Sequence, residues 1–264
     1  MLSIPNDILR ALCVDYDLST RDKIYLMSTC LTLKNQIRIT SVCINWCHCA
    51  NASSYFINDY RINNYVLQQK KFHNITNLNI TYNSKIRDIC HLTLLTELYA
   101  ASSICKVTCF NNLTNLTKLD LSFRNDLDIS ALTQLVYLNI NYSKIKQYNI
   151  KKLINLTTLK LRSNKYVNDI KHLTNLTHLN IACTPNIIGQ DSIYNLTNLS
   201  TLKMFDNKYV TNIYHLTKLT YLDIGGTCCI DQVGIMNLHS LTKIKYNCNS
   251  KITSTTHLTN LKNI

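Results

Sequence analysis

Cysteine and histidine are the residues of this sequence whose spacing first suggests chemistry. Four possible metal ligands lie within seven residues, at Cys43, Cys47, His48 and Cys49. Structural zinc sites usually contain a second pair of ligands at a distance, and no second cluster of paired cysteines follows this one. Two interpretations stay open, a metal site or buried thiols around Trp46, and the single cluster favours buried thiols.

Four histidines share one place in a recurring pattern, just before a leucine, which would suit a common role in binding a metal. Parallel strands lie about 4.8 Å apart, so histidines on separate repeats are too far apart for one ion with bonds of about 2 Å. We therefore predict a surface row of histidines and no metal site. The four residues are His91, His172, His215 and His257.

The adjacent cysteines Cys228 and Cys229 have two interpretations, a redox pair or two free thiols in a turn, and we favour the free thiols. The sequence has no phosphate-binding glycine motif, no H-E-x-x-H motif and no nucleophile elbow. Only 4 glycines occur in the 264 residues, which argues against tight catalytic loops. We predict that the protein is not an enzyme and binds no cofactor.

A leucine pattern recurs through about three-quarters of the chain. Its repeats therefore set where most of these cysteines and histidines lie. Residues 153–181 read LINLTTLKLRSNKYVNDIKHLTNLTHLNI, in which one phrase occurs twice. The third leucine of each copy serves as its anchor, and successive anchors are 19 to 23 residues apart. Self-similarity at a fixed period of this length predicts stacked repeats. The anchors are Leu78, Leu98, Leu119, Leu138, Leu159, Leu179, Leu202, Leu222, Ile244 and Ile264.

The phrase L-x-x-L-x-x-L-x-L-x-x-N resembles the leucine-rich repeat, in the short form found in internalins. Each L-x-L pair places two side chains on one face of a short strand, and stacked copies join their leucines into one core. We predict an α/β solenoid over residues 75–264, with about ten repeats and a curved parallel sheet. Units of about 20 residues leave little room for helices, so we expect extended or 3₁₀ segments on the outer side.

A turn position follows five residues after each anchor, and eight of its nine occupants are Asn, Ser or Thr. These side chains can bond to backbone groups that are left free where the chain turns. Arg124 is the exception, and we expect a looser turn there. The nine residues are Asn83, Ser103, Arg124, Ser143, Asn164, Thr184, Asn207, Thr227 and Asn249.

Residues 1–36 do not follow the repeat, and their apolar residues show helical spacing. They resemble the F-box, whose pattern L-P-x-E-I-L-x-x-I-L is matched by Ile4-Pro5, Asp7-Ile8-Leu9 and Leu12. The alternative is a plain helical cap that shields the end of the solenoid. Residues 37–74 then form a linker and the N-terminal flank of the solenoid.

The resemblance to F-box/leucine-rich-repeat proteins implies a function. Such proteins are substrate receptors of cullin–RING ubiquitin ligases, and versions occur in large DNA viruses with AT-rich genomes. By this resemblance Pro5, Ile8, Leu9 and Leu12 would bind a Skp-family adaptor, and the repeats would bind the protein substrate. The alternative is a stand-alone binding scaffold.

The strand positions that face away from the core vary from repeat to repeat and predict the partner-binding concave face. Aromatic and basic side chains are the types that dominate protein interfaces. The formal charge of +13 also admits binding of nucleic acid or another polyanion by this face, which we consider less favoured because no basic run exceeds two residues. The predicted contact residues are Tyr99, Tyr137, Lys160, Arg162, His178, Lys203, Phe205 and Tyr221.

The sequence shows neither a signal peptide nor an apolar stretch of about 18 residues. We therefore predict a soluble protein of the cytoplasm, the host cytoplasm if it is viral, with its 12 cysteines as reduced thiols. The last anchor, Ile264, lies at the end of the sequence. An exposed strand edge there would permit self-association.

Overall fold

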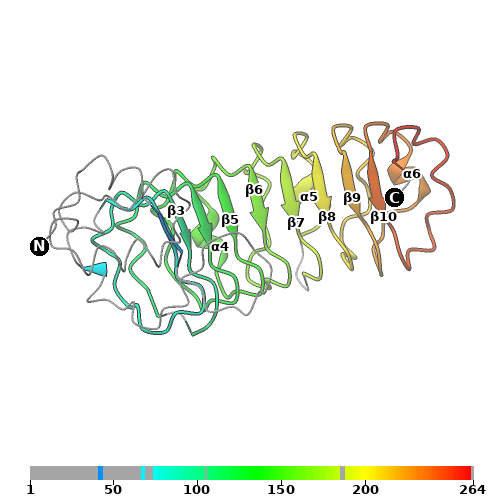
Figure 1. The fold of residues 1–264 in the computed structure, drawn as a ribbon. Helices are drawn as coiled ribbons and strands as arrows, with labels where there is room; N and C mark the ends of the chain where they lie inside the picture. Colours follow the sequence, from blue (N-terminus) through cyan, green and yellow to red (C-terminus); the bar gives the residue numbers. More distant parts are fainter. Residues whose placement is uncertain (1–40, 44–66, 69–73, 105, 185–187, 263–264) are drawn as a thin grey trace, which may run out of the picture.

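The computed structural model describes residues 41–43, 67–68, 74–104, 106–184 and 188–262. Ten short strands lie side by side in sequence order and form one parallel sheet, so the described chain is an elongated solenoid (Figure 1). The strands are β1 (Ser41–Cys43), β2 (Asn77–Asn79), β3 (Glu97–Tyr99), β4 (Lys118–Asp120), β5 (Tyr137–Asn139), β6 (Thr158–Lys160), β7 (His178–Asn180), β8 (Thr201–Lys203), β9 (Tyr221–Asp223) and β10 (Lys243–Lys245).

The register of the sheet confirms nine of the ten predicted anchors. Leu78 pairs with Leu98, and each following anchor pairs with the next as far as Ile244. Ile264, the tenth anchor, lies outside the described residues. The sheet gains a strand at its other end, because β1 pairs with β2 and aligns Val42 with Leu78. This strand lies within the segment assigned above to the linker and flank.

The leucines of the pattern fill one continuous core along the solenoid. The anchors from Leu78 to Leu222 are at most 1% exposed. A fully buried leucine contributes about 1.5–3 kcal/mol relative to an exposed one, so stability comes mainly from stacking one repeat on the next. We call each strand, together with the turn and the connection that follow it, a rung.

Every rung from β2 to β10 has a left-handed residue four positions after its anchor, with φ between 52° and 93°. The N–H of this residue still bonds to the next rung, as Phe123 N does to Asn141 O, while the chain turns inward. The following side chain is buried in seven of the nine rungs, and Ser103 and Thr227 are the exposed exceptions. The left-handed residues are Tyr82, Ser102, Phe123, Tyr142, Ser163, Cys183, Asp206, Gly226 and Cys248.

Asparagine closes the turn in the rungs of β2, β6, β8 and β10. Asn164 is fully buried, and its Oδ1 accepts hydrogen bonds from the backbone N–H groups of Tyr166 and Val167. Its Nδ2 donates backward to Ser143 Oγ and Ile145 O of the preceding rung. Asn207 and Asn249 make equivalent bonds, so this side chain joins its own turn to the rung before it.

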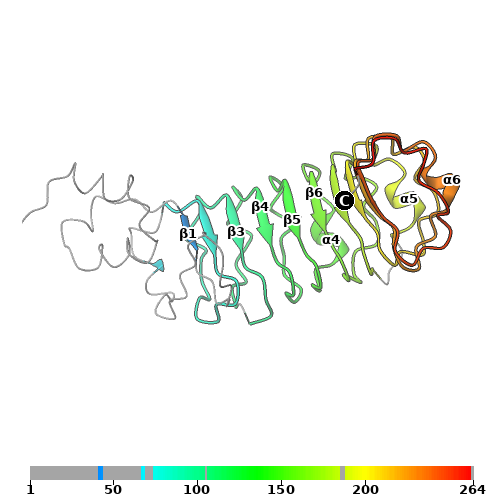
Figure 2. The ribbon, with the colours of Figure 1, turned by 45° about the vertical axis from the view of Figure 1, so that its right-hand side comes forward.

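Short helices of four residues follow the strands β5, β7 and β9, on the side of the solenoid opposite the sheet (Figure 2). The expectation of extended or 3₁₀ segments alone is therefore wrong for these three rungs. Each helix begins with glutamine, whose Nε2 and Oε1 bond to the backbone of the following rung. The helices are α4 (Gln147–Ile150), α5 (Gln190–Ile193) and α6 (Gln232–Ile235).

The two kinds of rung alternate and form linked pairs, β5 with β6, β7 with β8 and β9 with β10. Within each pair, the asparagine of the second rung donates a hydrogen bond to a backbone carbonyl of the first. The glutamine of the first rung donates one to a backbone carbonyl of the second. The helices start 43 and 42 residues apart, so the structural unit spans two leucine repeats. We call this unit a paired rung.

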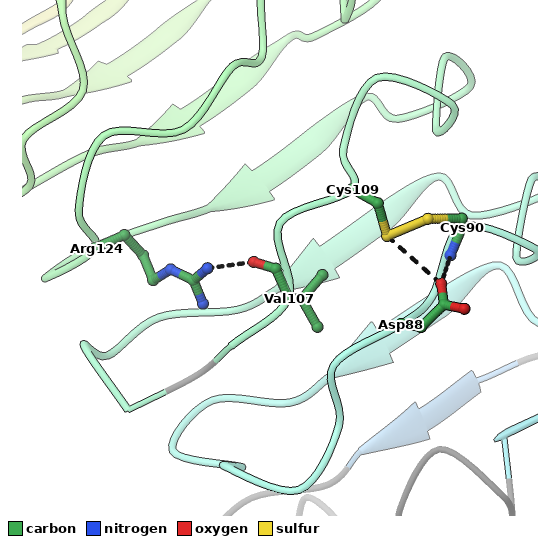
Figure 3. Close-up of a disulfide and its surroundings, with 5 residues drawn as sticks. All are labelled: Asp88, Cys90, Val107, Cys109 and Arg124. Atoms are coloured by element: carbon green, nitrogen blue, oxygen red, sulfur yellow. Dashed lines mark hydrogen bonds between the residues drawn. A yellow bond between two sulfur atoms is a disulfide. The ribbon is translucent and has the colours of Figure 1, made fainter.

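Arg124 takes the place of asparagine in the rung of β4, and the looser turn expected there stays a prediction. It is 4% exposed, and its Nη2 donates to Val107 O of the preceding rung (Figure 3). Its guanidinium lies 6.0 Å from the centre of the Phe110 ring. Nη1 has no hydrogen-bond partner in the structure, so the buried cation is only partly satisfied.

Candidate protein-binding face

All eight contact residues predicted from the sequence lie on, or directly beyond, the strand face that points away from the leucine core. The register places Tyr137, Thr158 and His178 in one row, and Asn139, Lys160 and Asn180 in the next. Arg162, His178 and Lys203 are exposed, and the other five side chains are partly buried by their neighbours on the face. The face is therefore continuous over β3 to β9.

One ion pair on the face joins β3 to β4. Glu97 Oε1 lies 2.6 Å from Lys118 Nζ, and this contact raises the pKa of the lysine. Tyr99 Oη donates to Glu97 Oε2 at 3.4 Å, and burial followed by the nearby carboxylate raises the pKa of the phenol. Asp120 accepts hydrogen bonds from Ser122 and from Asn139 Nδ2.

Lysines farther along the face lie over tyrosine rings. Lys160 Nζ is 5.1 Å from the centre of the Tyr137 ring, and Lys203 Nζ is 5.3 Å from the centre of the Tyr221 ring. Such cation–π contacts at exposed sites contribute about 0.5–1 kcal/mol each. They hold both ammonium groups above the sheet and leave their N–H donors available to a ligand.

Phe205 packs against a glycine of the neighbouring rung. A Cβ atom at Gly225 would lie 2.9 Å from Phe205 Cδ2, so only glycine permits the ring to lie this close. Phe205 is consequently half-buried on the face and offers part of its ring to a partner.

A pair of aromatic residues that the sequence analysis missed borders the face beside Arg162. The rings of Phe123 and Tyr142 stack with centroids 4.8 Å apart, and the Arg162 guanidinium lies 5.9 Å from the Tyr142 centroid. Phe123 is 52% exposed and Tyr142 is 43% exposed. Both occupy the left-handed position, where a bulky side chain costs roughly 1 kcal/mol or more. The signal in the sequence was an aromatic residue four positions after an anchor.

The predicted adaptor-binding residues Pro5, Ile8, Leu9 and Leu12 lie outside the described residues, as do Cys47, His48 and Cys49. The adaptor contact and the alternatives for the cysteine cluster therefore stay predictions.

The four repeat-derived histidines do not form a plain surface row, because all four are partly buried. His172 Nε2 and His257 Nε2 each lie 3.3 Å from a carbonyl at the end of the preceding helix, Ile150 O and Ile235 O. His91 Nε2 lies 3.0 Å from Leu67 O in the same manner. Burial instead lowers the pKa of His215, whose Nε2 has no hydrogen-bond partner in the structure. The four histidines lie on the separate rungs of β2, β6, β8 and β10, which are too far apart for one shared metal ion.

A disulfide joins Cys90 to Cys109 on the successive rungs of β2 and β3 (Figure 3). The prediction that every cysteine is a reduced thiol is therefore wrong for this pair. Asp88 lies beside it, with Cys109 Sγ 3.6 Å from Oδ1. Within the part of the chain that the structure describes, these three side chains form the one group of residue types that could bind a metal. The sulfur–sulfur bond occupies both thiols, so the arrangement is a covalent link between rungs.

The adjacent cysteines differ in exposure, because Cys228 is buried and Cys229 is partly buried. Burial raises the pKa of the Cys228 thiol to about 11, which disfavours the reactive thiolate. This agrees with the free-thiol interpretation. Within the described ranges, no helix is long and apolar enough to cross a membrane.

Comparison with known proteins shows the fold. No protein-family model matches the sequence, and a search of curated proteins found no match. An internalin, InlF, of Listeria monocytogenes aligns with a TM-score of 0.57 and 20% identity, covering 73% of this chain and 67% of its own. The functional domain of InlJ from the same species, which includes a cysteine ladder, gives 0.54 and 24%, over 74% of this chain and 49% of its own.

A leucine-rich-repeat protein of Leptospira interrogans gives a TM-score of 0.53 and 23% identity, over 73% of this chain and 54% of its own. The chain thus spans about half the length of two of these three proteins. Their similarity identifies the leucine-rich-repeat fold.

Proposed function

We propose that this protein binds another protein through the face formed by the outward residues of β3 to β9. The observation that carries the proposal is the contrast between a uniform leucine core and a varied face that holds Tyr137, Tyr221 and Phe205 partly exposed. Rigid aromatic side chains on a preformed surface are favourable interface residues, because few rotamers are lost on binding. No enzymatic activity is part of the proposal.

Capture of proteins from a cell extract, measured by quantitative mass spectrometry, tests the location of this interface. Tyr137→Ala/Tyr221→Ala should lose the proteins that the wild type captures. Tyr148→Ala/Tyr194→Ala is the matched control, because these two tyrosines are exposed on and beside the helices opposite the sheet. Equal capture by both double variants and the wild type would contradict an interface on the strand face.

We further propose, from the resemblance of residues 1–36 to the F-box, that the bound protein is a substrate for ubiquitin transfer. In this role Pro5, Ile8, Leu9 and Leu12 contact a Skp-family adaptor while the solenoid holds the substrate in the cytoplasm. The stand-alone scaffold is the alternative, and it fits the leucine-rich-repeat fold equally well.

Co-purification with a eukaryotic Skp-family adaptor separates these two roles. The receptor role predicts capture of the adaptor by the wild type and its loss in Pro5→Ala/Leu9→Ala, with an unchanged circular dichroism spectrum. Absence of the adaptor from the folded wild-type sample would leave the stand-alone scaffold.

A further inference from the structure

Positive charge collects on the C-terminal part of the strand face. The outward positions of β6 to β10, with the residue two places beyond each strand, carry five cations and one carboxylate, Asp223. Three ion pairs occur among the described residues, and none involves these five cations. We call them the basic strip: Lys160, Arg162, Lys203, Lys243 and Lys245.

One carboxylate, Asp223, stands in the same row as the lysines, between Lys203 and Lys245, and it forms no ion pair with either of them. Asp223 Oδ1 accepts from Gly225 N at 3.4 Å, and Asp206 Oδ1 accepts from Thr227 N at 2.9 Å and from Thr227 Oγ1 at 3.2 Å. The strip therefore differs from β3 and β4, where Glu97 pairs directly with Lys118. Unpaired cations concentrated on one surface attract an oppositely charged partner and speed its association.

The strip also has a regular spacing. Lys160, Lys203 and Lys245 follow the anchors of β6, β8 and β10, so they recur once in each paired rung. Two strand spacings amount to about 9.6 Å. Three residues of a polyproline II helix rise about 9.3 Å and return to the same side of the chain. An extended chain with a carboxylate at every third residue therefore matches the lysines.

We propose that the basic strip binds an acidic, extended segment of a partner protein. The inference rests on the proposed function and specifies the chemistry of the partner. Carboxylates of the segment accept hydrogen bonds from Lys160, Lys203 and Lys245. The stacked rings of Phe123 and Tyr142, next to Arg162, supply an apolar contact at one end of the strip.

The arrangement of the aromatic rings favours a protein over single-stranded nucleic acid. Sequence-tolerant nucleic-acid binding uses successive open ring faces on which bases stack. Here Lys160 covers a face of Tyr137, Lys203 covers a face of Tyr221, and Phe123 covers a face of Tyr142. The face thus presents cationic tips and ring edges, which suit carboxylates and aliphatic side chains.

Fluorescence anisotropy with a labelled Glu-Pro-Pro repeat peptide tests the inference, with the Gln-Pro-Pro peptide as the neutral probe. The protein variants are Lys160→Glu/Lys203→Glu and, as the matched control, Lys151→Glu/Lys152→Glu, whose lysines are exposed after α4 on the opposite side. Both pairs change the net charge equally. Circular dichroism and thermal unfolding check that each variant keeps its fold.

We expect the wild type and the control to bind the glutamate peptide and to ignore the glutamine peptide. The basic-strip variant should bind at least about tenfold more weakly than the control. Equal weakening in both variants overturns the inference, because net charge alone would then explain binding. Failure of the folded wild type to bind the glutamate peptide overturns it as well.

Two further results separate this inference from the proposed function. If polyuridine RNA binds more tightly than the peptide through the same lysines, the partner is nucleic acid and the inference is wrong. If Lys160→Glu/Lys203→Glu still captures the proteins that Tyr137→Ala/Tyr221→Ala loses, the protein-binding function stands and the acidic partner is rejected.

Discussion

The rungs of β6, β8 and β10 close their turns differently from the rungs of β5, β7 and β9. In the first kind a buried asparagine bonds inside the solenoid, as Asn164 and Asn207 do. In the second kind serine or threonine occupies that place, and a glutamine on the outer side bonds to the next rung. Two repeats therefore form one cohesive unit, and Lys160, Lys203 and Lys245 of the basic strip follow the same period.

Replacement of a buried asparagine should destabilise the protein more than any other substitution considered below. Asn164→Ala leaves two backbone N–H groups and one carbonyl of the interior without partners, so we expect unfolding to become easier by about 3 kcal/mol. Urea denaturation measures the change. Thr227→Ala alters the equivalent but exposed position and should cost less than about 0.5 kcal/mol. Similar losses for the two variants would remove the distinction between the two kinds of rung.

Substitution of Arg124 tests whether arginine stabilises the turn of the β4 rung in the way that asparagine stabilises the turns of other rungs. Arg124→Ala loses the bond to Val107 O and leaves a cavity, so we expect a loss of about 2 kcal/mol. Arg124→Asn should lose less, since asparagine supplies both the donor and the acceptor that the turn uses. Thermal unfolding of the two variants measures this difference. A larger loss of stability for Arg124→Asn than for Arg124→Ala would show that the turn of the β4 rung does not use the asparagine hydrogen bonds.

Removal of an outer glutamine should have a smaller effect. Gln190→Ala deletes the bonds to Thr211 and Asn212 at the solvent-accessible side, and water replaces part of what is lost. We expect a cost of about 1 kcal/mol in urea denaturation. Asp191→Ala, at the next position of α5, is the control and should change stability little. A loss of stability as large as that of Asn164→Ala would show that the outer glutamine and the buried asparagine stabilise the solenoid equally.

The smallest effect concerns pH and His215, the histidine of the β8 rung. Burial lowers its pKa in the folded protein below the ordinary value, so the unfolded chain binds the proton first as pH falls. The part of the stability that His215 contributes is complete above the unfolded pKa of about 6.5 and declines below it. Denaturant midpoints measured across this range should decline less with falling pH in His215→Gln than in the wild type. The exposed His239→Gln serves as the control, and an unchanged slope in His215→Gln would refute the assignment.

The leucine spacing predicted most of the sheet. Anchors from Leu78 to Ile244 repeat at nearly constant steps, and burial of one leucine row forces the register of its neighbour. β1 was missed because the sequence around Val42 lacks the phrase that precedes the other anchors. Its pairing with β2 depends on the stack and not on a local pattern.

The sequence also contains a signal for the paired rung, which the leucine pattern alone did not predict. Each turn asparagine is followed by a histidine eight residues later, as in Asn164 with His172 and Asn207 with His215. The leucine period of about 20 residues masked this longer period. The helices α4 to α6 were missed because four residues carry no apolar periodicity of their own, and their formation depends on tertiary bonds from glutamine.

The eight predicted face residues were chosen by their outward position, because strand side chains alternate, and by their aromatic or basic type. Their grouping into lysine–tyrosine pairs required the register of neighbouring rungs, as did the stack of Phe123 on Tyr142. The repeat spacing could also have predicted the disulfide. Cys90 and Cys109 are 19 residues apart, which is one repeat step, so they fall on successive rungs.

That disulfide decides how the solenoid responds to a pulling force. A stack of rungs held by neighbour contacts peels from an end, one strand after another, when its termini are drawn apart. The link between Cys90 and Cys109 encloses β3 in a covalent loop, so tension passes through the two sulfurs and bypasses that strand. β3 cannot be drawn out as extended chain while the bond is intact, and chemical reduction adds the length of this loop to the fully stretched molecule.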